Sequence, residues 1–504
     1  MAENRLGSLA KQTAIYGLSS IIGRFLNYLL VPLYTFKICT EAGGPAAYGI
    51  VTNLYAYTAL LLVILTFGME TTFFRFANKE GIVPNKAFST SNLAVGFVAL
   101  LFVILVSVFL KPIANVLNYA DNPEFVEIMA IIVALDAFQA ILFARLRYEN
   151  KAVKFATLKL LFIFLNIGMN LFIFFLAPGL KESHPALMGW YENSYQVGYI
   201  FIINLICTSV ITFGFIPEIK KLRFGIDRDM LKQMLKYTWP LLLLGLAGIL
   251  NQVADKICYR FIVPGEEGDR QLGIYGACVK IAMIMAMITQ AFRYAYEPFV
   301  FSGQHDKNDK LLQAKVMKYF IVFTLLAFLA VVMYMPILKY IIGPEYREGL
   351  GVVPIVMMAE IFMGIYFNLS FWYKLTDQTL WGAIFSAIGC AVLLAINFIF
   401  VPKYGYWACA WGGFAGYATC MVLSYIVGQK KAPIPYNLKS AFMYFAVAIV
   451  LYFAQKYIHI ESTVWTLVIN TGLLLVFFAF ICWREKDLTK AAINLVNSKV
   501  LKKK

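Results

Sequence analysis

Apolar residues occur along this chain in long runs that are separated by short polar segments. Each run has roughly 18 residues or more, which is the length that an α-helix needs to cross about 30 Å of hydrocarbon. The pattern therefore predicts an all-α integral membrane protein with about 14 transmembrane helices. The predicted spans are 13–36, 47–73, 89–110, 126–147, 154–177, 195–217, 238–262, 272–299, 316–342, 351–373, 378–401, 405–428, 438–458 and 463–483.

The composition supports the membrane assignment. Of the 504 residues, 61% are hydrophobic and 14% are charged, whereas about 25% of an ordinary soluble domain is charged. No predicted loop is long enough to form a soluble catalytic domain, so we expect no enzymatic activity and no catalytic residues. The eight cysteines include no C-x-x-C pair and the three histidines lie apart, so we expect no metal site.

The positively charged residues are concentrated in every second loop, and the net charge is +16. Loops rich in Lys and Arg stay on the cytoplasmic side of a membrane. The distribution predicts that both termini are cytoplasmic. Because topology explains the positive charge, we expect no nucleic-acid partner.

The predicted spans divide into two sets of six, followed by two more. A long, basic and amphipathic segment, 218–236, separates the two sets. The predicted organisation is an N-lobe at 1–217, a cytoplasmic linker at 218–236, a C-lobe at 237–429, two further helices at 430–483 and a basic cytoplasmic tail at 484–504.

The two lobes also resemble each other weakly in sequence. The segment AAYGIVTNLYAY (46–57) matches QLGIYGACVKIA (271–282). A threonine in the preceding span, Thr13 or Thr238, lies at nearly the same distance before the glycine of each segment. Internal repeats of this kind are typical of transporters and predict two pseudo-symmetric lobes.

Four basic residues lie inside the predicted spans: Arg24, Lys256, Lys280 and Arg293. A charge at the centre of a bilayer costs about 2.5–3.5 kcal/mol on insertion scales. We therefore expect these cations to line an aqueous cavity that accepts an anionic group. The alternative is that they pair with acids and hold helices together, as Arg293 would with Glu297 four residues later.

The segment GLAGILNQVADKICYRFIV (245–263) concentrates polar residues in one span. Asn251 and Asp255 share a helix face and are added to the predicted anion site, with Lys256 on the neighbouring stripe. Because adjacent side chains point apart, we expect Asp255 and Lys256 to pair with other residues. We expect Arg260 to extend to the membrane interface.

Two more acids, Asp136 and Glu360, lie near the middle of predicted spans. A buried carboxylate without a partner favours its protonated form. We therefore regard both as candidates for coupling to H⁺ or Na⁺, and expect no other cofactor. The alternative is that each is paired with a nearby base or hydroxyl group.

Several motifs carry a resemblance to a known family. They are GMETTFFRFANKE (68–80), Asn251 with Asp255 and Lys256 before LGIYGACVKIA (272–282), AFRYAYEPFVF (291–301) and INFIFVPKYGYWACAWG (396–412). With these motifs in order, the chain resembles O-antigen-type (Wzx) polysaccharide-biosynthesis flippases of the multidrug/oligosaccharidyl-lipid/polysaccharide (MOP) exporter superfamily. That family usually has Arg where this chain has Lys256.

The resemblance implies a transporter of the bacterial plasma (inner) membrane. Its substrate would be a polyprenyl-pyrophosphate-linked oligosaccharide, a repeat unit of O-antigen, capsule or exopolysaccharide. Two lobes would rock to expose a cationic central cavity to each side alternately. Membrane lipids and other membrane proteins of polysaccharide assembly are the further expected partners.

Three alternatives remain at this point. A lipid II flippase shares the helix number and the basic cavity. A multidrug (MATE-type) cation antiporter typically has twelve helices and an acidic cavity, so the fourteen spans and cationic interior disfavour it. A membrane glycan polymerase or ligase needs a sizeable outer loop, and the largest one here, about 178–194, is short.

Overall fold

The computed structural model of the chain describes residue 26 and residues 28–38, 40–223, 225–302, 307–376, 378–458 and 462–486. Nearly all of these residues are helical, and none of them forms a strand. The predicted all-α class is thereby confirmed. Most of the first predicted span, including Arg24, lies outside the described residues.

Thirteen helices of the described chain are long and apolar enough to cross a membrane, and they match the predicted spans after the first. The long helices are α3 (Gly44–Thr66), α5 (Pro84–Val108), α7 (Pro123–Tyr148), α8 (Ala152–Leu171), α10 (Gln196–Gly214), α12 (Arg228–Ile262), α13 (Glu266–Ser302), α14 (Lys307–Met333), α16 (Val353–Leu369), α18 (Leu380–Tyr404), α19 (Tyr406–Lys431), α20 (Leu438–Tyr457) and α21 (Thr463–Arg484). The short helices are α2 (Leu30–Lys37), α4 (Met69–Ala77), α6 (Leu110–Val116), α9 (Ala177–Ser183), α11 (Ile216–Ile219), α15 (Met335–Leu338) and α17 (Phe371–Leu375). The helical structure also includes short segments of three to five residues, at Thr40–Ala42, Phe172–Leu176, Asn193–Tyr195 and Lys339–Ile341. A longer 3₁₀ segment spans Pro344–Val352.

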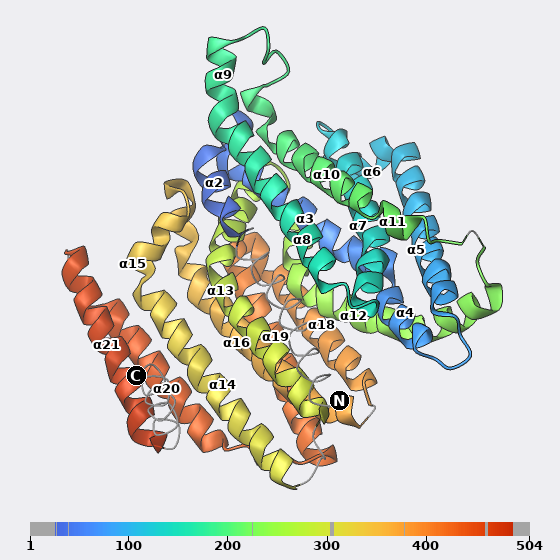
Figure 1. Cartoon of the computed structure of the whole chain (residues 1–504). Helices are drawn as coiled ribbons and strands as arrows, with labels where there is room; N and C mark the ends of the chain where they lie inside the picture. The colour runs from blue at the N-terminus through green and yellow to red at the C-terminus, as the bar shows by residue number, and fades with distance from the viewer. Residues whose placement is uncertain are drawn as a thin grey trace, which may run out of the picture.

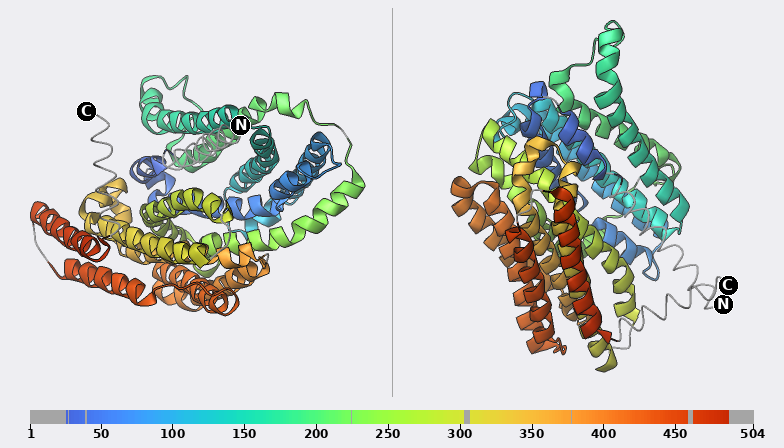
Figure 2. Two further views of the ribbon diagram at one scale, coloured as in Figure 1. Left: turned by 60° about the horizontal axis from the view of Figure 1, so that its bottom comes forward. Right: turned by 90° about the vertical axis from the view of Figure 1, so that its left-hand side faces the viewer.

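The long helices form two groups that lie side by side (Figures 1 and 2). We call helices α2 to α11 the N half and helices α13 to α19 the C half. In the N half α7 packs against α3, α5 and α10, and in the C half α16 packs in the same way against α13, α14 and α19. The two last helices, α20 and α21, pack on α14 at the edge of the C half. The shared pattern of neighbours is that of two structurally related halves.

The halves meet where α3 crosses α13. A Cβ atom on Gly49 would overlap the carbonyl oxygen of Asp269 and lie 3.1 Å from the nitrogen of Gly273. A Cβ atom on Gly273 would overlap the carbonyl oxygen of Pro45 and lie 2.9 Å from the nitrogen of Gly49. Gly49 and Gly273 are 224 positions apart in the sequence, and so are Pro45 and Asp269. The contacts are therefore mutual, and a pseudo-two-fold axis passes through this crossing.

The same spacing of 224 residues relates α7 of the N half to α16 of the C half without a gap. Asp136 on α7 corresponds to Glu360 on α16, and Phe143 corresponds to Phe367. Other identical pairs are Ile131 with Ile355, Phe138 with Phe362, and Ile141 with Ile365. The two carboxylates considered for ion coupling are thus equivalent positions of one repeat.

The segment between the halves is short, because α12 begins at Arg228, inside the predicted linker. Asp227 caps this helix: one carboxylate oxygen accepts the N–H of Met230 at 2.9 Å and the other lies 2.6 Å from Lys86 Nζ on α5. The hydrogen bond from Lys86 and the cap lower the pKa of the Asp227 carboxyl. The start of α12 is therefore attached to the N half, although the helix continues into the C half.

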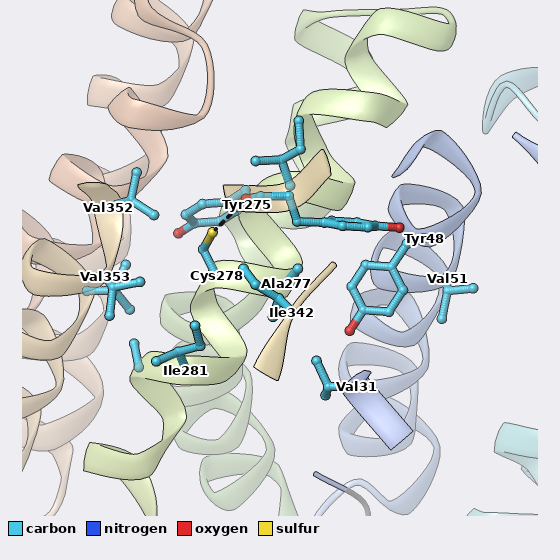
Figure 3. Close-up of a cluster of buried hydrophobic side chains, with 14 of the residues drawn as sticks. Val31, Tyr48, Val51, Tyr275, Ala277, Cys278, Ile281, Ile342, Val352 and Val353 are labelled. Atoms are coloured by element: carbon cyan, nitrogen blue, oxygen red, sulfur yellow. Dashed lines mark hydrogen bonds between the residues drawn. The ribbon is translucent and has the colours of Figure 1, made fainter. Parts of the chain in front are cut away.

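An apolar cluster surrounds the α3–α13 crossing (Figure 3). Val31, Tyr48 and Val51 lie on one side of it, and Cys278 and Val352 on the other. The rings of Tyr48 and Tyr346 meet edge to face with centroids 5.9 Å apart. We call the end of the molecule that contains this cluster, the start of α3 and the end of α12 the outer end, because the charge distribution predicts it to face outward.

Candidate functional site

Asp255 and Lys256 form an ion pair within α12. Lys256 Nζ lies 3.0 and 3.1 Å from the two carboxylate oxygens of Asp255, and it also donates to the carbonyl oxygen of Gln252 at 3.0 Å. The hydroxyl of Tyr275, on α13, donates to Asp255 Oδ2 at 2.8 Å. Only 6% of the Asp255 side chain is exposed, against 17% for Lys256. The carboxylate is thus enclosed, whereas the ammonium keeps some accessible surface.

The expectation that these two neighbours would not pair with each other was wrong. Adjacent Cβ atoms diverge on a helix, but a Cα–Cβ bond tilts towards the helix N-terminus and the lysine chain is long and flexible. Lys256 therefore folds back over the preceding turn, where it reaches both the Gln252 carbonyl and the Asp255 carboxylate.

Lys280 on α13 and Glu360 on α16 lie near this pair, and both interact electrostatically with Lys256. Glu360 Oε2 is buried and has no hydrogen-bond partner among the described residues. No ion pair in the described part of the chain includes Lys280. Two ammonium groups and two carboxylates from three helices are therefore grouped together, and we call them the Lys256 cluster.

Asn251 lies one turn before Asp255 and connects α12 to α18. Its amide donates to the carbonyl oxygen of Ser386 on α18 at 2.7 Å and to that of Ala247 at 2.8 Å. Its own oxygen, Oδ1, is buried without a partner among the residues described. These contacts give Asn251 a clear structural role, and its predicted role in substrate binding stays a prediction.

Arg293 is on α13 but lies far from the Lys256 cluster. It follows Lys280 by 13 residues, which is about 20 Å along a helix. The Arg293 side chain is exposed, and its guanidinium carbon lies 4.0 Å from the centroid of the Phe367 ring. The side chain of Glu297, the alternative partner, lies outside the described residues, as does Arg24.

Asp136, the equivalent of Glu360 in the N half, has different surroundings. The described charge that acts on it is Lys159, on α8. The ammonium of Lys159 lies 4.0 Å from the centroid of the Phe143 ring. Lys159 lies near the start of the predicted span 154–177, in the third turn of α8.

A second polar network joins the halves at the outer end. Asn53 on α3 donates to the carbonyl oxygen of Lys256 at 2.7 Å and accepts the hydroxyl of Tyr119 at 2.8 Å. The guanidinium of Arg260 lies 3.8 Å from the centroid of the Tyr119 ring. Arg260 Nε and Nη2 lie 2.9 and 3.0 Å from the two carboxylate oxygens of Asp269 on α13. We call these residues the outer network.

The prediction that Arg260 extends to the membrane interface was wrong. Arg260 is buried because Asp269, nine residues later, folds back beside it and because Tyr119 covers it from the N half. Sequence reasoning also missed Asn53, Tyr119 and Tyr275. The only signal was a polar residue, Asn53, within an apolar run, because a tyrosine in a membrane helix is too common to indicate a partner.

The comparisons with known proteins agree with this geometry. Residues 9–304 match the family described as polysaccharide biosynthesis protein, which is more than half of the chain. No curated protein matches the sequence. The chain belongs to the polysaccharide biosynthesis protein family.

Its fold is that of the MOP transporters. A structure of the lipid II flippase MurJ in an inward-closed conformation superposes with a TM-score of 0.68, covers 95% of this chain and 100% of that chain, and is 16% identical. An inward-facing MATE multidrug transporter has a TM-score of 0.62, covers 81% and 97%, and is 12% identical. An outward-facing MATE transporter has a TM-score of 0.51, covers 83% and 95%, and is 13% identical. The fold is therefore the one that these multi-pass membrane transporters and flippases share.

Proposed function

We propose that the protein moves a polyprenyl-pyrophosphate-linked oligosaccharide from the inner to the outer leaflet of a bacterial plasma membrane. The observation that carries this proposal is the Lys256 cluster, which places two ammonium groups at the depth of the membrane helices. The family indicates a substrate on the way to polysaccharide. Such a substrate has a charged pyrophosphate, and lysine ammonium groups bind phosphate oxygens as compact point charges.

Lys256 and Lys280 are the residues that we expect to bind the pyrophosphate. Two ammonium groups close to each other repel, and an anion between them relieves that repulsion. Asp255 is held by Tyr275 as well as by Lys256, so it stays in place when the ammonium turns towards a substrate. Arg24 and Arg293 remain proposed contacts at other depths.

Alternating access accounts for the closed outer end. The backbone contact of Gly49 with Gly273 and the outer network hold α3 against α12 and α13 there. The higher TM-score with the inward-facing than with the outward-facing MATE structure supports an inward-facing state. Release on the outer side then requires Asn53 to leave the Lys256 carbonyl and Tyr119 to leave Arg260.

Coupling to H⁺ or Na⁺ is part of the proposal, with Glu360 as the first candidate and Asp136 as the second. Glu360 has a buried oxygen without a hydrogen-bond partner in the described chain, and the charge of Lys256 acts on it. Loading and release of a cation at Glu360 would therefore change the electrostatic potential at the anion site. Membrane lipids and other membrane proteins of polysaccharide assembly are the proposed partners.

A lipid II flippase is the second candidate, and the superposition with MurJ over 95% of this chain favours it. Lipid II has the same polyprenyl-pyrophosphate group, so only the glycan separates the two functions. An organic-cation antiporter is less suited to the site, because Lys256 and Lys280 repel a cationic drug.

Complementation of two bacterial strains tests the proposal. One strain lacks its O-antigen flippase and the other is depleted of its lipid II flippase. We expect the wild-type chain to restore surface polysaccharide in the first strain and Lys256→Ala and Lys280→Ala, at equal membrane levels, to lose that activity. Rescue of the second strain alone would assign the function to lipid II. Rescue of surface polysaccharide by both lysine variants would remove the proposed anion site.

A further inference from the structure

The surface of α14 that α20 and α21 cover has an equivalent on α5. The spacing of 224 residues also relates α5 to α14. In these helices and just after them, it pairs five identical residues: Val98 with Val322, Leu101 with Leu325, Val108 with Val332, Pro112 with Pro336 and Ile113 with Ile337. The two surfaces lie at opposite edges of the molecule, α5 at one and α20 with α21 at the other (Figure 1).

In the C half this surface of α14 is buried under the two last helices. The ring of Phe328 lies 6.0 Å, between centroids, from that of Tyr452 on α20. The side-chain amide of Asn470 on α21 donates to the carbonyl oxygen of Met333 at 2.6 Å. Three residues that share this face by their helical spacing are at most 5% exposed: Ile321, Phe328 and Val332.

In the N half the equivalent face of α5 is uncovered in the part of the chain that the structure describes. Phe97, Ile104 and Val108, the equivalents of the three buried residues, are 65, 50 and 68% exposed. The helices α20 and α21 come after the second repeat, and the described N half contains no counterpart of them. One apolar helix face of the repeat is therefore packed against protein in one half and open in the other.

A groove of about 610 Å³ lies beside this open face, between α5 and α7. Phe97 and Leu100 line it from α5, Phe138 lines it from α7, and Ile226 of the segment between the halves also borders it. No other element among the described residues contributes to its walls. The groove is therefore open to an additional helix.

In the C half α20 lies over the corresponding groove, between α14 and α16. Ile321 and Phe362, the equivalents of Phe97 and Phe138, line that groove together with residues of α20. The rings of Phe362 and Phe445, on α20, have centroids 6.1 Å apart. The repeat thus shows which kind of element this groove accepts, namely an apolar membrane-spanning helix.

Asn92 adds a polar group to the groove of the N half. Its side chain is fully buried, and its amide donates to the carbonyl oxygen of Phe138 at 3.2 Å. Its own oxygen, Oδ1, has no hydrogen-bond partner among the residues described, and its equivalent in the C half is the apolar Val316. A lipid hydrocarbon chain cannot donate a hydrogen bond, whereas a polar side chain on a helix can. The groove is therefore better matched to a helix than to a lipid chain.

We propose that the exposed face of α5 and the α5–α7 groove bind a membrane-spanning helix of a second protein, in the place that α20 takes on α14. That helix has large apolar side chains on one face, which pack against Phe97 and Ile104, and a hydrogen-bond donor at the level of Asn92. The partner is a membrane protein of polysaccharide assembly. The inference therefore rests on the proposed function and gives the surface for one of its partners.

The test uses the full-length protein in cells that make the polysaccharide. The photo-reactive residue p-benzoyl-phenylalanine replaces Phe97 or, as the matched control, Phe164, an exposed phenylalanine of α8 in the same half. Mass spectrometry identifies the segments that become cross-linked. Separately, Leu100→Trp enlarges a side chain of the groove, and Phe164→Trp is its control. Both variants are assayed for surface polysaccharide in cells and, after purification, for flipping of the lipid-linked oligosaccharide in proteoliposomes.

We expect the residue at Phe97 to cross-link to a membrane-spanning segment of another protein and the residue at Phe164 to cross-link to none. Leu100→Trp should lower that cross-link and the surface polysaccharide about fivefold, because the larger side chain overpacks the interface. Flipping by purified Leu100→Trp should stay within about twofold of the wild type, since α5 contributes nothing to the Lys256 cluster. Phe164→Trp should behave as the wild type does in both assays.

Cross-links from position 97 only to lipid, to a second copy of this chain or to another segment of the same chain would overturn the proposal. Unchanged surface polysaccharide in Leu100→Trp would overturn it too. An equal loss in cells and in proteoliposomes would make Leu100 a structural residue and would also remove the docking site. Failure of the wild type to flip the substrate in proteoliposomes would instead overturn the proposed function.

Discussion

The N half and the C half share a backbone arrangement but differ in the charges that they place in the membrane. Both have a glycine at the crossing, Gly49 and Gly273, and a carboxylate at equivalent positions of α7 and α16, Asp136 and Glu360. Only Glu360 has two lysines nearby, Lys256 on α12 and Lys280 on α13. Groups that packing requires are therefore present twice, whereas the proposed anion site is strongly asymmetric.

This difference separates two roles of polar residues in the membrane helices. A residue that serves the fold should behave like its equivalent in the other half. A residue that serves transport should have no equivalent in the other half, or an equivalent whose substitution has a smaller effect on transport. Variants of paired positions test this distinction directly.

The largest expected effect is on folding and concerns the shared glycines. Gly49→Val and Gly273→Val each place carbon atoms against a backbone carbonyl of the other helix, so each should destabilise the fold by about 3 kcal/mol. Thermal unfolding in detergent measures the loss. Gly248→Val, where a Cβ atom meets nothing within 4 Å, is the control. A large effect of only one of the two glycine variants would contradict the two-fold relation.

The next effect is on transport and concerns Lys256 on α12. Lys256→Ala should reduce flipping about 10- to 100-fold while the protein stays folded, because a charge-assisted contact to phosphate is lost. Lys439→Ala, at an exposed position at the start of α20, is the control. In the double variant Asp255→Ala/Lys256→Ala no charge of the pair remains. Recovery of transport in that variant would show that the pair serves only to neutralise charge.

A smaller effect distinguishes the two carboxylates. Glu360→Gln should change the dependence of transport on the ion gradient about tenfold, since Lys256 acts on Glu360, whereas Asp136→Asn should change it about twofold. Flipping is measured in proteoliposomes with and without a pH or Na⁺ gradient. Equal effects of the two variants would mean that the two equivalent carboxylates contribute equally to ion coupling and that the lysines near Glu360 do not determine it.

The smallest effect concerns an ion-pair group at the inner end of the N half. Burial acts to raise the pKa of the Glu149 carboxyl, but the hydrogen bonds from Lys151 and Arg145 lower it overall. A lowered folded-state pKa stabilises the protein above the unfolded value of about 4.3, and this contribution is lost as the pH falls through the folded pKa. Glu149→Gln should therefore cost about 0.5–1 kcal/mol at pH 7 and progressively less as the pH falls below the unfolded-state pKa, measured by thermal unfolding.

The thirteen membrane helices of the described residues, and their order, could be predicted from the sequence, because each is an apolar run long enough to cross a bilayer. The ends could not be predicted as well. The first turns of α12, from Arg228, are polar because they pack against the N half near Lys86 and not against lipid. The hydropathy of a segment does not show that it continues a helix outside the hydrocarbon layer.

The candidate site was predicted in part. The spacing of polar residues identified Asp255, Lys256, Lys280 and Glu360, and the structure brings these four together. The partners were not predictable, because Asn53 and Tyr119 belong to the other half and are more than 130 residues away in sequence. Contacts of that kind depend on the crossing of two helices at Gly49, which no single helix encodes.

The Asp255–Lys256 pair has a consequence for the way in which the protein is made. A helix that carries a single charge into the membrane is neutralised only after a later helix with the opposite charge has been synthesised. Here acid and base are neighbours in the chain and pair within one helix turn, so α12 carries both charges into the bilayer already compensated. Insertion of α12 can therefore precede synthesis of the rest of the C half. Lys256, which we propose as a ligand of the anionic substrate, is thereby placed in the membrane before the other helices of the C half are made.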